Sequence, residues 1–203
     1  MATNDSELLI GTSNLGKVKE IKSALEGLPL RFRSLAEYLD LSMPIENGET
    51  YAENAIIKAT DYARQTGLTV LADDSGLEVD WLAGAPGVHS ARFGAGSDAD
   101  RVDLLLSKLA EASDDQRQAR FVSVVAIVHP TVGVINVSEG ECRGRINHFP
   151  LGDNGFGYDP VFIPNGYEQT FGQLPNDVKT QISHRAKSLA LAKAFLAELL
   201  GTA

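Results

Sequence analysis

The chain has 203 residues, of which 43% are apolar and 22% are charged, as in an ordinary globular domain. Its 18 basic and 27 acidic residues give a formal net charge of −9, which argues against a protein that binds nucleic acid or a membrane surface through a basic face. A chain of this length buries roughly 70% of its unfolded surface, so we expect one domain over residues 1–203 that needs no disulfide or structural metal to fold.

Three features indicate a cytoplasmic protein. Cys142 is the only cysteine, so no disulfide framework and no cysteine-rich zinc site is expected. The first five residues have no basic region typical of a signal peptide. The longest uncharged run, residues 121–138, is interrupted by His129 and Pro130, which favours two buried strands joined by a turn over a membrane span.

The first half of the chain predicts alternating strands and helices. Residues 7–11 read as a short buried strand, followed by a glycine-containing loop and a helix that ends near Gly27. A second helix is expected over residues 51–66, because Thr50 and Glu53 form a capping box and Gly67 follows as the terminating glycine. Two short strands come next, over residues 68–72 and 77–81.

The second half predicts fewer helices and more strands. Residues 84–96 and 147–157 are rich in glycine and are expected to be loops. Ser97 and Asp100 begin a helix that runs to about Ala112. Three strands are expected, over residues 120–128, 133–138 and 141–146, and a last helix over residues 183–200. The order of elements indicates an α/β fold with a mixed sheet, opening into two lobes around a cleft.

The loop between the first strand and the first helix is a candidate anion site. It reads Gly11-Thr12-Ser13-Asn14-Leu15-Gly16-Lys17, and backbone N–H groups at a helix N-terminus attract phosphate. The spacing matches a P-loop, but Val18 stands where a P-loop has the serine or threonine that holds Mg²⁺. A plain helix start with no bound anion explains the spacing equally well.

Adjacent carboxylates at Asp73 and Asp74 are a candidate metal site. Neighbouring residues of a strand point to opposite faces, so one of the two must face solvent or a ligand. Carboxylate oxygens suit Mg²⁺, which takes only one or two protein ligands, whereas an aspartate turn would need no metal at all. Glu46 and Glu49 lie in a nearby loop that could add a second carboxylate.

Two segments late in the chain are candidates for contact with a base or a phosphate. The glycines around Phe156 leave its ring clear of the backbone for stacking, and Asp159 could accept hydrogen bonds from ring N–H groups, although a turn with a buried aromatic is the simpler interpretation. Lys179 and the Ser183-His184-Arg185 sequence could place positive charge beside an anion, or could be a helix cap with solvated charges.

Together these segments resemble the inosine/xanthosine triphosphate pyrophosphatase family, which removes non-standard purine nucleotides. The resemblance covers nearly the whole chain in six ordered stretches: TSNLGK (12–17), ENAIIKA (53–59), ADDSGLEVD (72–80), GAPGVHSAR (84–92), GFGYDPVF (155–162) and SHR (183–185). It implies an elongated mixed central sheet flanked by helices, with two lobes and a central cleft. It also implies a homodimer and a Mg²⁺ cofactor.

The resemblance assigns a role to each candidate. Asp74 is implied as the catalytic carboxylate and a Mg²⁺ ligand, with Glu46 as the second and less secure metal carboxylate. The residues implied to bind substrate are Thr12, Ser13, Asn14, Leu15, Gly16, Lys17, Ser75, Phe156, Gly157, Tyr158, Asp159, Lys179, His184 and Arg185.

The implied reaction is attack of water on the α-phosphorus of ITP, dITP or XTP, which releases a monophosphate and pyrophosphate. Mg²⁺ and Lys17 would neutralise the charged leaving group. Two alternatives stay open on the sequence: a P-loop-like phosphotransferase, and a nucleotide-binding module without catalysis. The relative preference among the three substrates cannot be read from the sequence.

Overall fold

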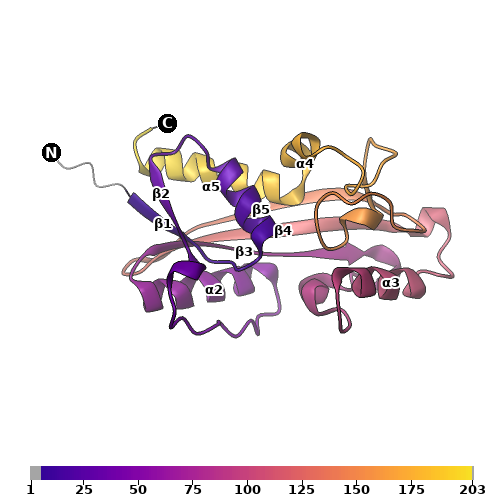
Figure 1. Cartoon of the computed structure of the whole chain (residues 1–203), viewed down its shortest axis with the longest axis horizontal. Coiled ribbons are helices and arrows are strands. Elements are labelled where there is room, and N and C mark those ends of the chain that lie inside the picture. Colours follow the sequence, from indigo (N-terminus) through magenta and orange to yellow (C-terminus); the bar gives the residue numbers. More distant parts are fainter. Residues whose placement is uncertain (1–5, 203) are drawn as a thin grey trace. The chain divides into compact units, whose positions relative to one another are not determined.

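The computed structural model describes residues 6–202, and these form a mixed sheet of six strands with helices packed against it (Figure 1). The strand order is β2-β1-β3-β4-β5-β6. The first strand, β1, pairs in parallel with both β2 and β3, whereas β5 and β6 are antiparallel. The predicted α/β class and mixed sheet are therefore confirmed.

The elements follow one another with these bounds. The strands are β1 Ser6–Ile10, β2 Leu30–Ser34, β3 Thr69–Val79, β4 Gln118–His129, β5 Gly133–Ile146 and β6 Phe162–Pro164. The α-helices are α1 Leu15–Ala24, α2 Tyr51–Thr66, α3 Asp98–Lys108, α4 Asn176–Ile182 and α5 His184–Leu199. No helix in the described part of the chain is both long and apolar enough to cross a membrane.

The chain divides into two compact units. Unit 1 comprises residues 1–74, 123–140 and 185–203, and unit 2 comprises residues 75–122 and 141–184. Strands β3, β4 and β5 each contribute residues to both units. The predicted cleft between two lobes stays a prediction.

Unit 1 carries helices on both faces of its strands. Figure 1 shows α5 on one side of them and α2 on the other. Leu8, Ile10 and Leu71 of β1 and β3 share a buried core with Ile21 of α1 and Leu189 of α5. The alternation of side chains along each strand leaves the other face to α2, whose alanines Ala55, Ala59 and Ala63 are buried.

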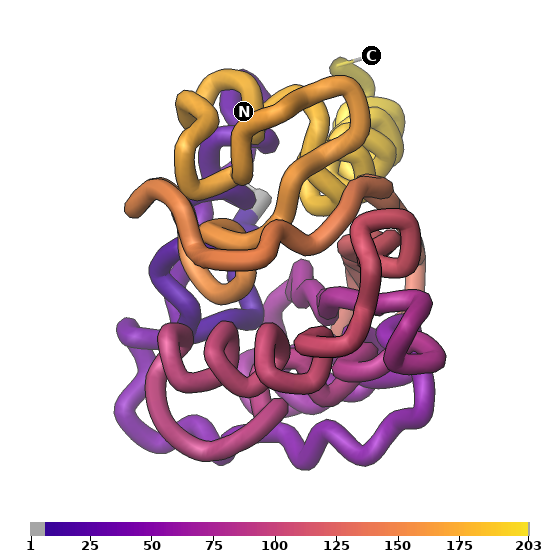
Figure 2. Tube along the Cα trace, turned by 90° about the vertical axis from the view of Figure 1, so that its right-hand side faces the viewer, coloured from indigo at the N-terminus to yellow at the C-terminus, as the bar shows by residue number. Residues whose placement is uncertain are grey.

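Unit 2 is built around an aromatic core. Phe121, Phe162 and Phe171 lie with ring centroids 4.7–6.4 Å apart, and Leu105 and Leu109 at the C-terminal end of α3 belong to the same buried cluster. Figures 1 and 2 both show α3 on one side of this unit and the orange segment that follows β5 on the other. That segment contains the glycine-bracketed stretch around Phe156.

Several predicted boundaries are wrong for a common reason. The strands predicted over residues 68–72 and 77–81 are one strand, β3, and those over 133–138 and 141–146 are one strand, β5. Pairing with neighbouring strands keeps Gly76 and Gly140 extended, where local propensity alone suggests a break. The pair Asp73-Asp74 therefore lies inside a strand and does not follow one.

Candidate active site

The strand–loop–helix at the N-terminus has the form that the sequence predicts. Strand β1 ends at Ile10, and α1 begins at Leu15 with Asn14 as its N-cap. The side chain of Asn14 accepts a hydrogen bond from Lys17 N (3.1 Å), and the hydroxyl oxygen of Thr12 accepts one from Asn14 N (3.2 Å). Ser13 is exposed in this loop, and Leu15, Gly16 and Lys17 form the first turn of the helix.

The loop passes close to β3 because Gly11 has no side chain. A Cβ atom at Gly11 would lie 3.0 Å from Val70 Cγ1 and 3.1 Å from Ala72 Cβ. The first turn of α1, whose N–H groups and dipole attract anions, is thereby fixed beside the strand that carries the two aspartates.

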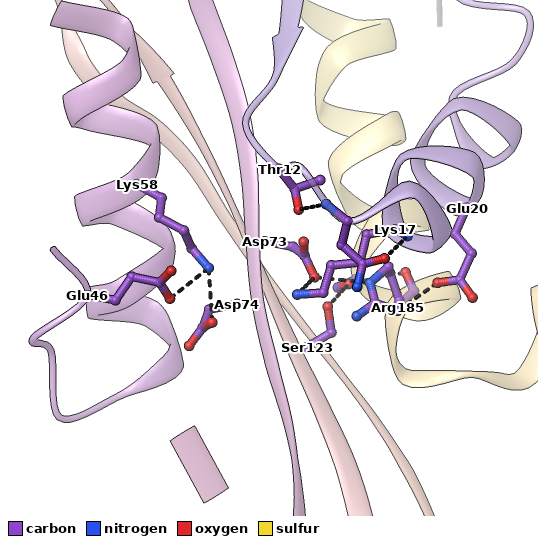
Figure 3. A network of polar contacts seen from close by, with 11 residues as sticks. Thr12, Lys17, Glu20, Glu46, Lys58, Asp73, Asp74, Ser123 and Arg185 are labelled. Atoms are coloured by element: carbon purple, nitrogen blue, oxygen red, sulfur yellow. Dashed lines mark hydrogen bonds and ion pairs between the residues drawn. The ribbon is translucent and has the colours of Figure 1, made fainter. Parts of the chain in front are cut away.

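Asp73 and Asp74 lie on either side of β3, as neighbours in a strand must (Figure 3). Both residues are buried, at 1% and 7% exposure, so of the two predicted surroundings, solvent or a ligand, open solvent does not apply and contact with a ligand stays a prediction. Each carboxylate instead meets a lysine: Lys17 Nζ is 3.1 Å from Asp73 Oδ2, and Lys58 Nζ is 3.0 Å from Asp74 Oδ1.

The Asp73 side of the strand is a buried ion network. Arg185, which is 2% exposed, donates from Nε to Asp73 Oδ2 (3.0 Å) and from a terminal nitrogen to Glu20 Oε2 (2.6 Å). Burial opposes the charge of Asp73, but Lys17 and Arg185 outweigh it and hold the pKa of this carboxyl well below its usual range. Burial lowers the pKa of Lys17, and the Asp73 carboxylate opposes that shift.

On the Asp74 side of the strand, the effect of burial on the pKa outweighs the effect of the nearby ammonium group. Burial raises the pKa of the Asp74 carboxyl above its ordinary value, although the Lys58 ammonium works against the shift. Asp74 Oδ2 is buried and has no hydrogen-bond partner among the described residues. A buried carboxylate with a raised pKa and an oxygen without a partner is the kind of group that accepts a proton or binds a cation.

Glu46 joins this side of the strand. Its Oε2 lies 3.1 Å from Lys58 Nζ, so one ammonium contacts both Glu46 and Asp74 (Figure 3). Glu49, the alternative carboxylate, is exposed, and its backbone N–H donates to Glu53. Within residues 6–202 no group of three or more histidine, cysteine, aspartate or glutamate side chains is arranged to hold a metal ion.

Unit 2 contains a second polar cluster, around Asp159. This carboxylate is 2% exposed, and its Oδ2 accepts hydrogen bonds from Phe156 N (2.8 Å) and from Lys179 Nζ (2.6 Å). The Lys179 ammonium also lies 4.7 Å from the centre of the Phe156 ring, within cation–π distance. Three of the predicted substrate-binding residues, Phe156, Asp159 and Lys179, are thus held together by direct contacts.

The remaining predicted residues of unit 2 are fixed by the core. Tyr158 is buried and donates its hydroxyl to Ser90 O (3.0 Å), and burial raises the pKa of Tyr158 to about 12. Gly157 N donates to Asp98 (2.8 Å), and the His184 ring stacks on Phe121 with centroids 4.6 Å apart. Ser75 is half-buried in β3.

Two residues of the site were missed from the sequence. Lys58 lies in the ENAIIKA stretch (53–59), one helical turn after Asn54, but no role is assigned to it from the sequence. Glu20 is the carboxylate that pairs with Arg185. The helical spacing of residues 54, 58, 61 and 65 was the available signal for Lys58; no signal indicated Glu20, whose partner is 165 positions away.

Comparison with known proteins places the chain among one group of relatives. The Ham1 family model matches residues 8–195. The chain is 41% identical to a dITP/XTP pyrophosphatase of Nostoc sp. PCC 7120, covering 96% of each chain, and 45% identical to a dITP/XTP pyrophosphatase of Deinococcus radiodurans, covering 90% of this chain and 89% of the relative. The Ham1 protein structure from Staphylococcus aureus superposes with a TM-score of 0.85 at 36% identity, covering 96% of this chain and all of the other.

Proposed function

The chain belongs to the Ham1 family, and we propose that it hydrolyses dITP, ITP and XTP to the monophosphate and pyrophosphate by attack of water on the α-phosphorus. One observation of the structure carries the proposal. The strand that bears two adjacent aspartates presents one of them to Lys17 at an anion-attracting helix start, and the other to Lys58, which also contacts Glu46. Phosphate binding and acid–base chemistry are thus supplied by one short stretch of β3.

Asp74 is assigned as the catalytic carboxylate. Its pKa is raised by burial, so the carboxylate is a stronger base than an exposed aspartate and can orient a water molecule and take its proton. The Lys58 ammonium works against this rise in the pKa of Asp74, because it stabilises the charged carboxylate. Asp73 has the opposite role, because it stays charged and holds Lys17 in place for the triphosphate.

The residues around Asp74 fit a Mg²⁺ ion. Asp74 and Glu46 are two hard carboxylate donors, and the buried Asp74 Oδ2, which has no hydrogen-bond partner among the described residues, could coordinate the cation. Mg²⁺ is ordinarily held by one or two carboxylates together with water and substrate phosphates, so no third acidic side chain is required. When bound, the ion would neutralise charge on the departing pyrophosphate.

Binding of the other parts of the nucleotide is assigned as follows. Residues 12–17 are proposed to hold the phosphates through the N–H groups of the first turn of α1, with Lys17 supplying a full positive charge. In unit 2 the ring of Phe156 would stack on the base, and Gly157, Tyr158, Asp159, Lys179 and His184 would shape the base site. Ser75 and Arg185 complete the proposed set.

Selectivity for hypoxanthine and xanthine would come from donors that face O6 of the base. A 6-amino group cannot accept these hydrogen bonds, and leaving buried donors unpaired costs about 1–3 kcal/mol each. Lys179 is a suitable donor, because it is buried and its position is fixed by Asp159. Adenine nucleotides are therefore expected to be poor substrates.

A substrate panel tests the proposal. Purified protein with Mg²⁺ is incubated in parallel with ITP, dITP, XTP, ATP and GTP, and the products are separated by ion exchange. Pyrophosphate and monophosphate from the first three substrates are expected, with ATP turned over at least about 100-fold less efficiently. Release of orthophosphate would contradict the proposed reaction. Transfer of a γ-phosphoryl group to an acceptor would support the phosphotransferase alternative, and tight binding of ITP without turnover would support the binding module.

We also propose that the protein is cytoplasmic, on the sequence features given above, and that it is a homodimer, on the family resemblance alone. Light scattering coupled to size-exclusion chromatography measures the mass in solution. A mass of twice 21.7 kDa is expected, and a mass of 21.7 kDa at micromolar concentration would contradict the proposal.

A further inference from the structure

Glu46 lies in a loop that has little apolar packing. We call residues 39–49 the Glu46 loop. Its side chains Leu39, Met43 and Ile45 are 80–97% exposed, so burial of apolar surface does little to fix the loop. Asn47 N donates to Ile45 O (3.1 Å), which closes a three-residue turn centred on Glu46. Segments with so few buried contacts open at a low free-energy cost, so something else must hold Glu46 in place.

Two amide side chains of α2 hold the loop, one on each side of Glu46. Before it, the amide of Gln65 pairs with the backbone of Ser42 in both directions: Ser42 N donates to Oε1 (2.9 Å), and Nε2 donates to Ser42 O (3.0 Å). After it, the fully buried Asn54 accepts a hydrogen bond from Gly48 N at Oδ1 (2.9 Å). A Cβ atom at Gly48 would lie 2.8 Å from that same Oδ1, so a glycine is needed for this approach.

The two amide side chains that anchor the loop, Asn54 and Gln65, lie with Lys58 on one face of α2. Residues 54, 58, 61 and 65 follow the spacing at which α-helical side chains share a face. Asp61 accepts a second hydrogen bond from Gln65 Nε2 (2.9 Å), which fixes the orientation of the amide. A single rigid helix therefore presents the two anchors of the loop together with the ammonium that contacts Glu46 and Asp74.

We infer that Gln65 and Asn54 are positioning residues for Glu46: they hold the Glu46 loop on α2 so that the second carboxylate is already in place when a divalent cation arrives. The inference rests on the proposed metal-binding role of Glu46. The two hydrogen bonds between Gln65 and Ser42 are exposed and lie at the weak end of the range for a net hydrogen bond, so together they change the population of the loop conformation by about five-fold. Loss of an anchor should therefore weaken metal binding and leave the chemical step intact.

Gln65→Ala tests the inference at an exposed position where folding is not at risk. The half-saturating Mg²⁺ concentration for hydrolysis of ITP should rise about five-fold, while kcat at saturating Mg²⁺ and the melting temperature stay near the wild-type values. Arg64→Ala is the matched control, because it truncates an exposed neighbour on the same helix. A merely structural role of Gln65 would lower the melting temperature and would not be rescued by Mg²⁺.

Two readouts do not depend on turnover. Binding of Mn²⁺ in the presence of a non-hydrolysable inosine triphosphate analogue, followed by electron paramagnetic resonance, should weaken by the same factor in Gln65→Ala. Chymotrypsin should also cleave after Leu39 or Leu41 about five-fold faster in this variant. Wild-type Mn²⁺ affinity and wild-type cleavage rates in Gln65→Ala would overturn the inference.

A double-mutant cycle separates this inference from the proposed function. Glu46→Gln should raise the half-saturating Mg²⁺ concentration, and adding Gln65→Ala to it should cause no further rise, because the anchor then has no carboxylate to position. If Glu46→Gln leaves the Mg²⁺ dependence unchanged, the proposed metal role of Glu46 is wrong. If Glu46→Gln shifts it but Gln65→Ala behaves as Arg64→Ala does, or still adds five-fold in the double variant, the positioning role is wrong.

Discussion

Asp73 and Asp74 are adjacent in sequence and chemically identical, yet the fold gives them opposite properties. Asp73 lies between Lys17 and Arg185, which stabilise its charged form, whereas the burial of Asp74 outweighs its contact with Lys58. The alternation of side chains along β3 causes this difference, because it places the two carboxylates in different surroundings. One aspartate is suited to hold cations and the other to accept a proton.

Asp74→Asn keeps the shape of the side chain and removes its basicity. Turnover of ITP should fall by about 10³-fold, which is within the range for loss of a general base, while the protein still folds. Steady-state kinetics with circular dichroism as the folding control measures both quantities. A variant with near-wild-type kcat would remove Asp74 from the catalytic role.

Asp73→Asn should act on stability. It leaves Lys17 and Arg185 buried without their shared counter-ion, so the free energy of unfolding should drop by about 3 kcal/mol in urea titrations at pH 7. Asp40→Asn is the control, because Asp40 is exposed in the same unit, and it should change the free energy of unfolding by less than about 0.5 kcal/mol. Equal effects of the two variants would show that the buried network contributes nothing.

The difference in unfolding free energy between wild type and Asp73→Asn should depend on pH, because the pKa of Asp73 is shifted in the folded protein. The pKa of Asp73 is lower in the folded protein than in the unfolded chain, so its contribution is complete above about pH 5 and is lost as the pH falls through the folded pKa. The gap in unfolding free energy between wild type and Asp73→Asn should therefore shrink below pH 4, by about 1.4 kcal/mol per pH unit. A gap that stays constant down to pH 2.5 would contradict the shift.

At the scale of elements, local signals were reliable where capping or turn chemistry decides the structure. The capping boxes at Thr50 and Ser97 and the left-handed Gly67 (φ 69°) start and end helices as predicted. The strand β2 and the helix α4 were not predicted, because each is short and its apolar residues complete a core formed by distant segments. The continuous β3 was missed for the same reason: its glycine is held extended by pairing that no local pattern shows.

The residues of the candidate site could be predicted from local sequence, but the contacts between them could not. The residues of the anion loop, the double aspartate and the Phe156–Asp159 segment could be named from local motifs. Their pairing could not, because the contacts Lys58–Asp74, Lys17–Asp73 and Arg185–Glu20 join residues 16 to 165 positions apart. Only the folded chain shows that each aspartate has its own cation.

The loop at residues 155–159 offers a test at this scale. Gly155 has φ 78°, and a Cβ atom there would lie 2.0 Å from Asp159 Oδ2, so Gly155→Ala should push Asp159 away from Lys179. We expect the KM for ITP to rise about 10-fold or more, because the proposed base site is disturbed. Gly166→Ala is the matched control: its φ is 87°, with nothing within 4 Å of the added Cβ, and it should change stability alone. The same KM in both variants would contradict the assignment.

For the molecule as a whole, most of the net negative charge comes from one stretch of the sequence. Residues 34–91 carry ten acids and two bases, and Glu46, Asp73, Asp74 and Lys58 all belong to that stretch. Lys17, Lys179 and Arg185 come from other parts of the chain and each contacts a buried carboxylate. A net charge of −9 is therefore compatible with a phosphate-rich substrate, because the positive charges are placed individually and do not form a broad basic face.

If water attacks the α-phosphorus, as we propose, the oxygen of that water ends up in the monophosphate. ITP is hydrolysed with Mg²⁺ in H₂¹⁸O, and the monophosphate and pyrophosphate are separated and analysed by mass spectrometry. We expect one ¹⁸O atom in the inosine monophosphate and none in the pyrophosphate. Label in the pyrophosphate would mean attack on the β-phosphorus and would contradict the assignment of the reaction.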